Sequence, residues 1–483
     1  MPDSHEKWSE EEFGGSMLGD PRRVRRLVAV AAEAARRPAG QVTAVFDDDA
    51  EREGAFRLVG NPAVHGDDIA LAAHEACARR SAGAELVYVP IDGSSLNLTD
   101  TKRQKGLGHI GARYIGAQGM QVITAMAVTP QGVPLGLCGQ KYWARVRPST
   151  KRAKRDRRKT EEKEIQHWLT VMQQVREVYS AEAASTMPWF QIDREGDAWP
   201  ILLQARQANE RLTVRASHDR RLETDDGRVY LWDAMEEKPC LGTYELDVPS
   251  KPERRLSKQR RGRARQGRRA TIEIRGGSVT LSMLDERTRQ RHRQAISAVL
   301  AREVCPPEGE EPIEWLLLTT APITTFEEAR LVVFGYTQRW RIEDFHRAWK
   351  SGVCDVEDTQ LRGRDRIIRW ATILASVAVR TIRLAYLARH QPQRSALEEF
   401  SRAELDAILL ASPRTRHLRG TIPTIFDAVT FLAKLGGYTG KASGGPPGPR
   451  VLARGLQRIE VLADVLSDAS SQNPCQSCQR SDS

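Results

Sequence analysis

The sequence lacks the features of membrane-inserted and secreted proteins. Only 40% of its 483 residues are hydrophobic, and we find no apolar run near the roughly 20 residues that a membrane-spanning helix requires. The N-terminal segment MPDSHEKWSEEEFGG is acidic and polar and contains no apolar core, so we do not expect it to act as a secretory signal. These absences predict a cytoplasmic protein, and its length predicts roughly two to four domains.

The sequence also lacks a cysteine pattern that would indicate disulfide bonds. Its seven cysteines are odd in number and scattered along the chain, so we expect reduced thiols. Cys475 and Cys478 form a CxxC in a polar tail, but no second pair of ligands lies nearby in the sequence. Simple tail thiols are therefore a better interpretation of this motif than a metal site.

Positive charge is abundant and concentrated. Lys and Arg number 74 against 63 Asp and Glu, which gives a net charge of +11. Nine of the fifteen residues from Arg145 to Lys159 are basic, as are ten of the nineteen from Lys251 to Arg269. Blocks of this density favour contact with the phosphates of a nucleic acid, although a solvated loop remains the alternative.

A basic amphipathic helix is predicted near the N-terminus, from about residue 21 to 37. Asp20 followed by Pro21 is typical of a helix start, and apolar residues recur with helical spacing after it. The opposite face would present arginines to a DNA backbone, with a solvated face as the alternative. These arginines are Arg22, Arg23, Arg26 and Arg36.

Short apolar runs that end in aspartate predict an α/β sheet with its chemistry at one edge. Residues 85–91 read as a strand that ends at Asp92, and residues 189–192 read as a strand that ends at Asp193. Between them we expect further short strands joined by a turn, then a helix over about 160–179. Asp197 competes with Asp193 as the second functional acid, and either acid could instead be a turn residue. Residues from about 210 to 320 predict an antiparallel β insertion.

A long helix is predicted from Phe326 to Ser351, opened by a capping box of Thr325 and Glu328. Its apolar pattern runs through Leu331, Trp340, Phe345 and Trp349. Seven-residue spacing would place a phenol, a carboxylate and an ammonium on one stripe, with a guanidinium beside it. That set suits a site for a metal and a phosphodiester, although an exposed face of ion pairs is the alternative. The four residues are Tyr336, Glu343, Lys350 and Arg339.

Three strings together resemble one enzyme family. PIDGSSLN around Asp92, WFQIDREGD around Asp193 and YTQRWRIEDFHRAWKSG from Tyr336 to Gly352 are similar to cut-and-paste DDE transposases of the transposon-five type, in the family of insertion sequence four. The last string reproduces the Tyr, Arg, Glu, Lys spacing of that family, with two, three and six intervening residues. LGDPRRVRRLVAVAAEAA, GAFRLVGNP and EWLLLTT also resemble family segments, so the likeness extends from Leu18 to about Arg383.

The resemblance implies a fold and a domain plan. The fold class would be α/β, with a ribonuclease-H-like catalytic core over 71–370 that carries the β insertion at about 210–320. A helical DNA end-recognition domain would occupy 1–70, and a helical C-terminal region at 371–483 would form a dimer interface. The dimer assignment follows from family analogy alone.

The resemblance also implies the site and the reaction. Asp92, Asp193 and Glu343 would hold two Mg²⁺ or Mn²⁺ ions, while Tyr336, Arg339 and Lys350 would hold terminal phosphates and a flipped base on which Trp315 stacks. The residues implied to contact the transposon end are Arg22, Arg23, Arg26, Arg36 and Arg57. The enzyme would nick the ends, form and reopen a hairpin, and join the 3′-hydroxyl to target DNA as a homodimer on paired ends. The alternatives are a related metal-dependent nuclease and an inactive end-binding protein.

Overall fold

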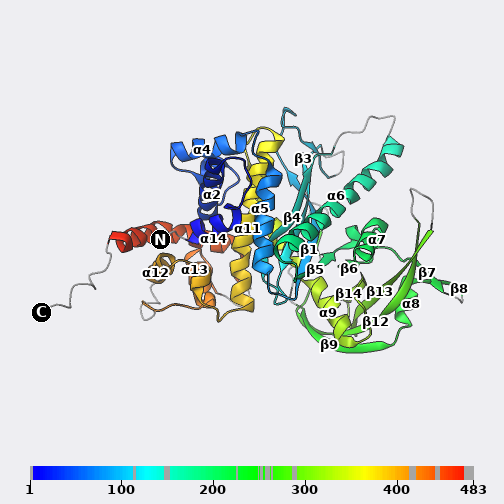
Figure 1. The fold of residues 1–483 in the computed structure, drawn as a ribbon. Coiled ribbons are helices and arrows are strands. Elements are labelled where there is room, and N and C mark those ends of the chain that lie inside the picture. The colour runs from blue at the N-terminus through cyan, green and yellow to red at the C-terminus, as the bar shows by residue number, and fades with distance from the viewer. Residues whose placement is uncertain are drawn as a thin grey trace.

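The computed structural model describes residues 4–111, 116–145, 153–224, 227–248, 250, 254–255, 261–262, 265–284, 291–412, 420–440 and 446–472. Helices lie at both ends of the chain and a large mixed sheet lies between them (Figure 1). The CxxC pair and much of the two basic blocks fall outside the described residues.

The N-terminal unit is helical, as predicted. Asp20 accepts a hydrogen bond from the Arg22 backbone N at 2.8 Å, and Pro21 is the first residue of the helix. Asp20 therefore caps this helix, as predicted. The bounds are α1 Ser4–Phe13, α2 Pro21–Arg36, α3 Val42–Val45, α4 Asp49–Gly60 and α5 Gly66–Ser81.

Twelve described strands form one sheet in the order β2-β3-β1-β5-β6-β14-β13-β12-β7-β8, with β4 paired to β3 and β9 paired to β12. The pairs β1–β5 and β5–β6 are parallel, and the others are antiparallel. The strands are β1 Leu86–Asn97, β2 Gly108–His109, β3 Gln118–Val128, β4 Pro134–Trp143, β5 Met187–Ile192, β6 Arg211–Arg215, β7 Arg221–Thr224, β8 Gly227–Tyr230, β9 Cys240–Val248, β12 Arg268–Leu284, β13 Arg291–Val304 and β14 Glu314–Thr319. A separate pair consists of β10 Arg254–Arg255 and β11 Arg261–Gly262.

The predicted β-rich segment at 210–320 therefore continues the same sheet. Its strands are antiparallel except for β6, which pairs in parallel with β5 through Ile192 and Val214. Because β14 pairs with β6, the long hairpin of β12 and β13 extends the sheet that carries the predicted acids.

The two faces of the sheet bury different side chains. Along β1, Val87, Val89 and Ile91 join one buried cluster, while Tyr88 joins the other, as the alternation of a strand requires. The first cluster includes residues of the connecting helices α6 Ala153–Glu182, α7 Trp199–Gln207 and α8 Leu231–Glu236. The second includes residues of α2, α5, α9 Phe326–Thr337, α10 Trp340–Arg347 and α11 Arg364–His390.

The long helix predicted from Phe326 to Ser351 is interrupted. The capping box of Thr325 and Glu328 forms as expected, but α9 ends at Thr337, α10 starts at Trp340, and a π-helical turn, η3 Ala348–Gly352, follows. The apolar stripe is also wrong in part. Leu331 of α9 is 42% exposed and Trp340 at the start of α10 is 52% exposed, whereas Phe345 and Trp349 are buried.

The C-terminal part is helical and has its own buried cluster. It contains η4 Val356–Asp358, η5 Ala396–Glu398, α12 Arg402–Ala411, α13 Ile425–Leu435 and α14 Pro449–Gln472. Within the described chain, α11 is the one helix whose length and composition would suffice to cross a membrane. However, 83% of its apolar window is buried inside the protein, so α11 is a core helix and not a membrane span.

Candidate active site

Asp92 lies inside a strand and not at its end. The sequence predicted that the strand would stop at Ile91, but β1 continues to Asn97 and pairs Asp92 with Thr124 of β3. The prediction failed because small polar residues after Asp92 keep the extended conformation when a neighbouring strand supplies the hydrogen bonds. Asp92 has the same strand parity as Tyr88, so its side chain lies on the sheet face covered by α9, α10 and α11.

Asp193 directly follows β5, as predicted. The parallel pairing of Ile91 with Ile192 places Asp92 and Asp193 level on neighbouring strands. The Asp193 carboxylate accepts a hydrogen bond from the Glu195 backbone N at 2.9 Å and thereby caps the short turn η2 Arg194–Gly196. The competitor Asp197 is buried, and its Oδ2 accepts from Ser217 N at 2.6 Å and also pairs with Arg220. Asp197 therefore holds two loops together.

Glu343 approaches the two aspartates from α10. This helix contacts β1, and His346, one turn after Glu343, places its Nδ1 3.7 Å from Asp92 Oδ2. The Glu343 carboxylate accepts a hydrogen bond from Arg339 Nη2 at 2.6 Å. The structure thus brings the third acid into the same neighbourhood, with its charge directed at a buried arginine.

The neighbourhood holds an excess of negative charge. Burial raises the pKa of Asp92 to about 7, and the charges of Asp193, Glu195 and Glu343 act in the same direction, against Arg339. Glu195 and His346 were not among the site residues predicted from the sequence. The string DREGD does contain a signal for Glu195. Asp193 caps a short turn, and a residue two positions later in such a turn stays close to the end of β5. His346 lies three residues after Glu343 and so shares its helix face.

This donor set fits a divalent metal in its chemistry. Carboxylate oxygens are the ligands that Mg²⁺ and Mn²⁺ prefer, and a cation among them would offset the repulsion that raises the pKa of Asp92. Among the described residues, no three His, Cys, Asp or Glu side chains are grouped so that they could hold one ion. Metal binding would therefore require a new side-chain rotamer, such as one that releases the Glu343 carboxylate from Arg339.

The remaining predicted residues of the α9–α10 region lie around the acids. Tyr336 is buried, and its ring meets that of Trp315 on β14 edge to face, with 5.9 Å between centroids. The Arg339 guanidinium lies 6.0 Å from the centroid of the same tyrosine ring. Lys350 lies in η3, where its Nζ is 3.3 Å from Ser94 Oγ and 3.6 Å from Glu357 Oε1. The phenol, the indole and the guanidinium thus form one group, and Lys350 lies farther along β1.

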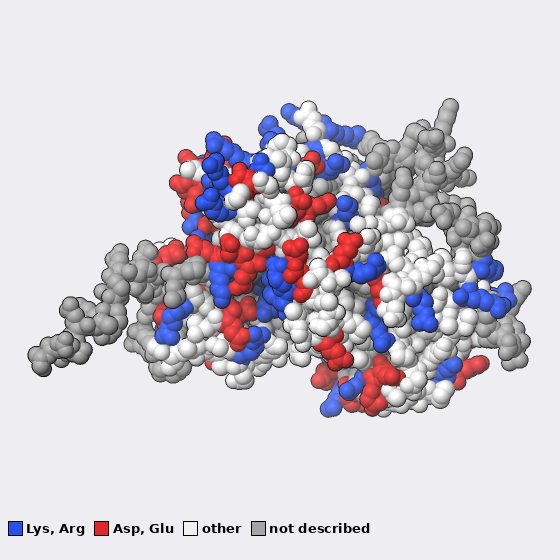
Figure 2. Space-filling view, in the orientation of Figure 1, with Lys and Arg blue, Asp and Glu red and all other residues white. Residues whose placement is uncertain are grey.

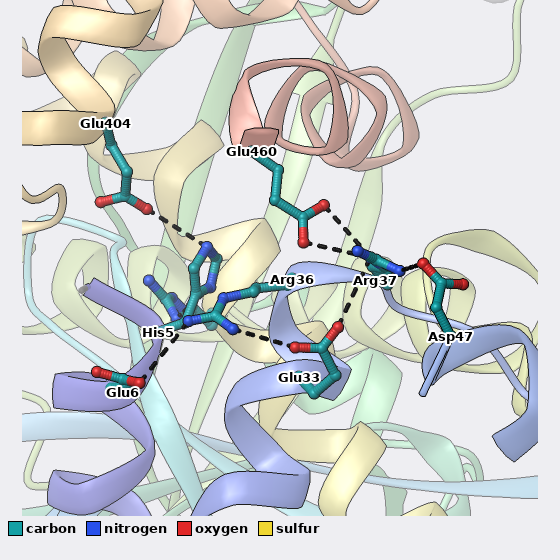
Figure 3. A network of polar contacts seen from close by, with 9 residues as sticks. His5, Glu6, Glu33, Arg36, Arg37, Asp47, Glu404 and Glu460 are labelled. Carbon is teal, nitrogen blue, oxygen red and sulfur yellow. Dashed lines mark hydrogen bonds and ion pairs between the residues drawn. The ribbon is translucent and has the colours of Figure 1, made fainter. Parts of the chain in front are cut away.

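The predicted N-terminal arginines divide into two sets. Arg22 and Arg26 are exposed on α2, and Arg57 is exposed on α4, in a region where basic side chains gather at the upper left of Figure 2. Arg23 is half-buried and donates to Leu18 O at 2.8 Å. Arg36 lies apart, because its guanidinium pairs with Glu33 at 3.1 Å and with Glu6 at 3.9 Å (Figure 3).

One large cavity does not coincide with the acids. It has a volume of about 1300 Å³ and lies between α1, the middle of α11, α12 and α14, and none of the three predicted acids lines it.

Two family matches accompany this geometry. Residues 5–64 match the transposase DNA-binding family, and residues 201–380 match the transposase DDE domain family. The first match covers α1 to α4, and the second runs from α7 through α11 and includes Glu343. Both matches follow the order of the resemblance found in the sequence, and together they identify the chain as a DDE-type transposase, a metal-dependent enzyme that acts on DNA.

Proposed function

We propose that this transposase is a cut-and-paste enzyme of the transposon-five type that uses Asp92, Asp193 and Glu343 as its catalytic acids. The observation that carries the proposal is their common position. Asp92 on β1 is level with Asp193, which directly follows the parallel neighbour β5, and α10 brings Glu343 close to both. Strand parity and register, which are properties of the backbone, support this grouping.

The proposal includes a ribonuclease-H-like core. Its support is the strand order β4-β3-β1-β5-β6, in which β1, β5 and β6 are parallel and β3 and β4 antiparallel. We assign residues 1–70 to end recognition, 71–370 to the catalytic core and 371–483 to a dimerisation region. The enzyme would act on double-stranded transposon ends and target DNA as a homodimer, in the cytoplasm and at the nucleoid.

The residues have distinct proposed roles. Asp92, Asp193 and Glu343 would hold two Mg²⁺ or Mn²⁺ ions, which when bound supply water activation and stabilisation of the leaving oxygen. Arg339 and Lys350 would hold phosphate oxygens, which guanidinium and ammonium groups bind well. Trp315 and Tyr336 would receive a base flipped from the stack, because aromatic stacking offsets part of the unstacking cost.

The reaction sequence needs no covalent protein intermediate. Water cleaves one strand at the transposon end and releases a 3′-hydroxyl. That hydroxyl attacks the opposite strand and forms a hairpin, which water reopens at the same residues. The 3′-hydroxyl then attacks a phosphodiester of the target. Each step is an in-line displacement at phosphorus, so one set of residues can serve all of them.

Incubation of the purified protein with Mg²⁺, a labelled DNA end and a supercoiled target plasmid tests the proposal. The end would be taken from the inverted repeats that flank the gene. We expect cleaved end, hairpin and end joined to plasmid. Cleavage without joined product would instead identify a nuclease, and end binding without any cleavage would identify an inactive end-binding protein.

A further inference from the structure

A loop of residues 98–107, held by hydrogen bonds to Asp100, follows β1 beyond the predicted acids. Asp100 organises the loop, because its carboxylate accepts hydrogen bonds from Gln104 N at 3.0 Å and Lys105 N at 3.1 Å. Arg103 N also donates to Asp100 O at 3.1 Å, and Arg103 has a φ of 52°, in the left-handed region that long side chains rarely adopt. The one acid of the loop is thus used to shape it, while the cations Lys102 and Arg103 are exposed.

The loop meets the start of α11, which is also basic. A Cβ placed on Gly106 would lie 3.8 Å from Arg364 Cβ, so the two segments touch although they are far apart in sequence. We name the resulting patch the loop–helix surface; it consists of Lys102, Arg103, Lys105, Arg362, Arg364 and Arg366. Two acids adjoin it: Asp100 lies inside the loop, and Asp365 lies 3.6 Å from Arg364. Within the described chain the other five cations form no ion pair.

The loop–helix surface lies between the N-terminal helices and the predicted acids. Toward the acids, β1 runs back from the loop to Asp92 and passes Ser94, which Lys350 contacts. Toward the N-terminal helices, the Arg366 guanidinium carbon lies 3.6 Å from the Cβ position of Gly60, the last residue of α4. In Figure 1 the loop reaches the top of the molecule beside the start of α11, and Lys and Arg side chains crowd that edge in Figure 2.

We propose that the loop–helix surface binds the sugar-phosphate backbone of the duplex that spans from the N-terminal helices to the acids. Cations without acid partners bind phosphates at little cost, because no internal ion pair must break. Contacts to the sugar-phosphate backbone carry no sequence information directly, so a duplex of random sequence is a suitable probe for this surface. That this duplex is a transposon end rests on the proposed function, whereas the backbone contact does not.

Fluorescence anisotropy with a random-sequence duplex, titrated with salt in the absence of divalent metal, tests the inference. The variant Arg103→Ala with Lys105→Ala should lower the slope of log affinity against log salt by about two, since each lost phosphate contact removes about 0.9. Arg394→Ala with Arg402→Ala is the matched control. It removes the same charge, but from arginines already paired with Glu398 and with Asp406 at 3.1 Å. Its slope should stay at the wild-type value.

A charge-conserving variant separates charge from loop shape. Arg103→Lys with Lys105→Arg should keep the wild-type slope, because the positive charge and the Asp100 turn both remain. An unchanged slope in the alanine variant, or an equal fall in the control, would overturn the inference. The assay needs no cleavage, so its result stands even if the joining assay yields no product. Conversely, if the wild-type protein joins ends to the plasmid but the alanine variant keeps the wild-type salt slope, the loop–helix surface is rejected and the proposed function stands.

Discussion

Two groups of charged side chains drawn from distant parts of the chain differ in how they are balanced. In the first, Arg37 pairs with Glu33 at 3.6 Å, with Glu460 at 3.2 Å and with Asp47, and so joins α2 to α14 (Figure 3). In the second, Asp92 lies among other acids with Arg339 as the main opposing charge. The balanced group holds helices together, whereas the unbalanced group costs folding free energy and is suited to bind a cation.

Neutralising the central acid should have the largest effect. Asp92→Asn should lower DNA cleavage on the order of 10⁴-fold, the scale seen when one member of a catalytic unit is lost, while leaving end binding intact. Single-turnover kinetics in Mg²⁺ measure the cleavage rate, and fluorescence anisotropy measures end binding. Asp233→Asn, on the exposed face of α8, is the control and should cleave like wild type. Normal cleavage by Asp92→Asn would show that catalysis lies elsewhere.

Breaking the balanced group should affect stability and not chemistry. Arg37→Ala leaves Glu33 and Glu460 partly buried without their shared partner, and should lower the free energy of unfolding by about 1 to 2 kcal/mol. Urea unfolding of the variant, of Glu460→Gln and of the double variant gives the coupling energy. Strictly additive losses would show that the 3.2 Å contact contributes nothing to folding.

A second buried pair, Glu404 of α12 with His5 of α1, should fail at low pH. Although burial raises the pKa of Glu404, its hydrogen bonds with His5 and Ser4 lower it to about 2. The folded-state pKa lies below the unfolded value, so this stabilisation is complete above about pH 4.5. It declines toward pH 2, by up to about 1.4 kcal/mol per unit. The difference in unfolding free energy between wild type and Glu404→Gln should therefore shrink over this range. A constant difference would contradict the assignment.

The smallest effect compares two arginines of α2. Arg26→Ala should weaken end binding and lower its salt slope by about one, because Arg26 is exposed and available to a phosphate. Arg36→Ala should change the slope less, since its guanidinium already pairs with Glu33 and Glu6. Equal slopes for both variants would show that the ion pairs of Arg36 open when DNA binds.

Local signals predicted much of this fold. The Asp20–Pro21 helix start, the capping box at Thr325 and the strand before Asp193 each depend on a few neighbouring residues, and each is present. The extension of β1 past Asp92 could not be predicted, because β3 supplies it from elsewhere in the chain. The interruption after Thr337 was not predicted either: Gly335 lies just before it in the sequence, and it forms next to the buried Tyr336.

The candidate site divides in the same way. Local strings drew attention to all three acids, but the level placement of Asp92 and Asp193 depends on a parallel register that no short segment encodes. The separation of Arg36 from the other α2 arginines depends on Glu33, its i−3 neighbour on α2, and on Glu6 of α1, which only the folded chain brings to it. Tertiary contacts therefore decide which predicted charges remain available.

Asp92 lies in β1, which pairs with β3 on one side and with β5 on the other. Glu343, in contrast, lies on the eight-residue helix α10, which follows the interruption after α9. Amide exchange should consequently be slow around Asp92 and faster along α10. The site would then combine one fixed carboxylate, Asp92, with one movable carboxylate, Glu343. A single side-chain rotation of Glu343 away from Arg339 could therefore determine when the site is able to bind metal.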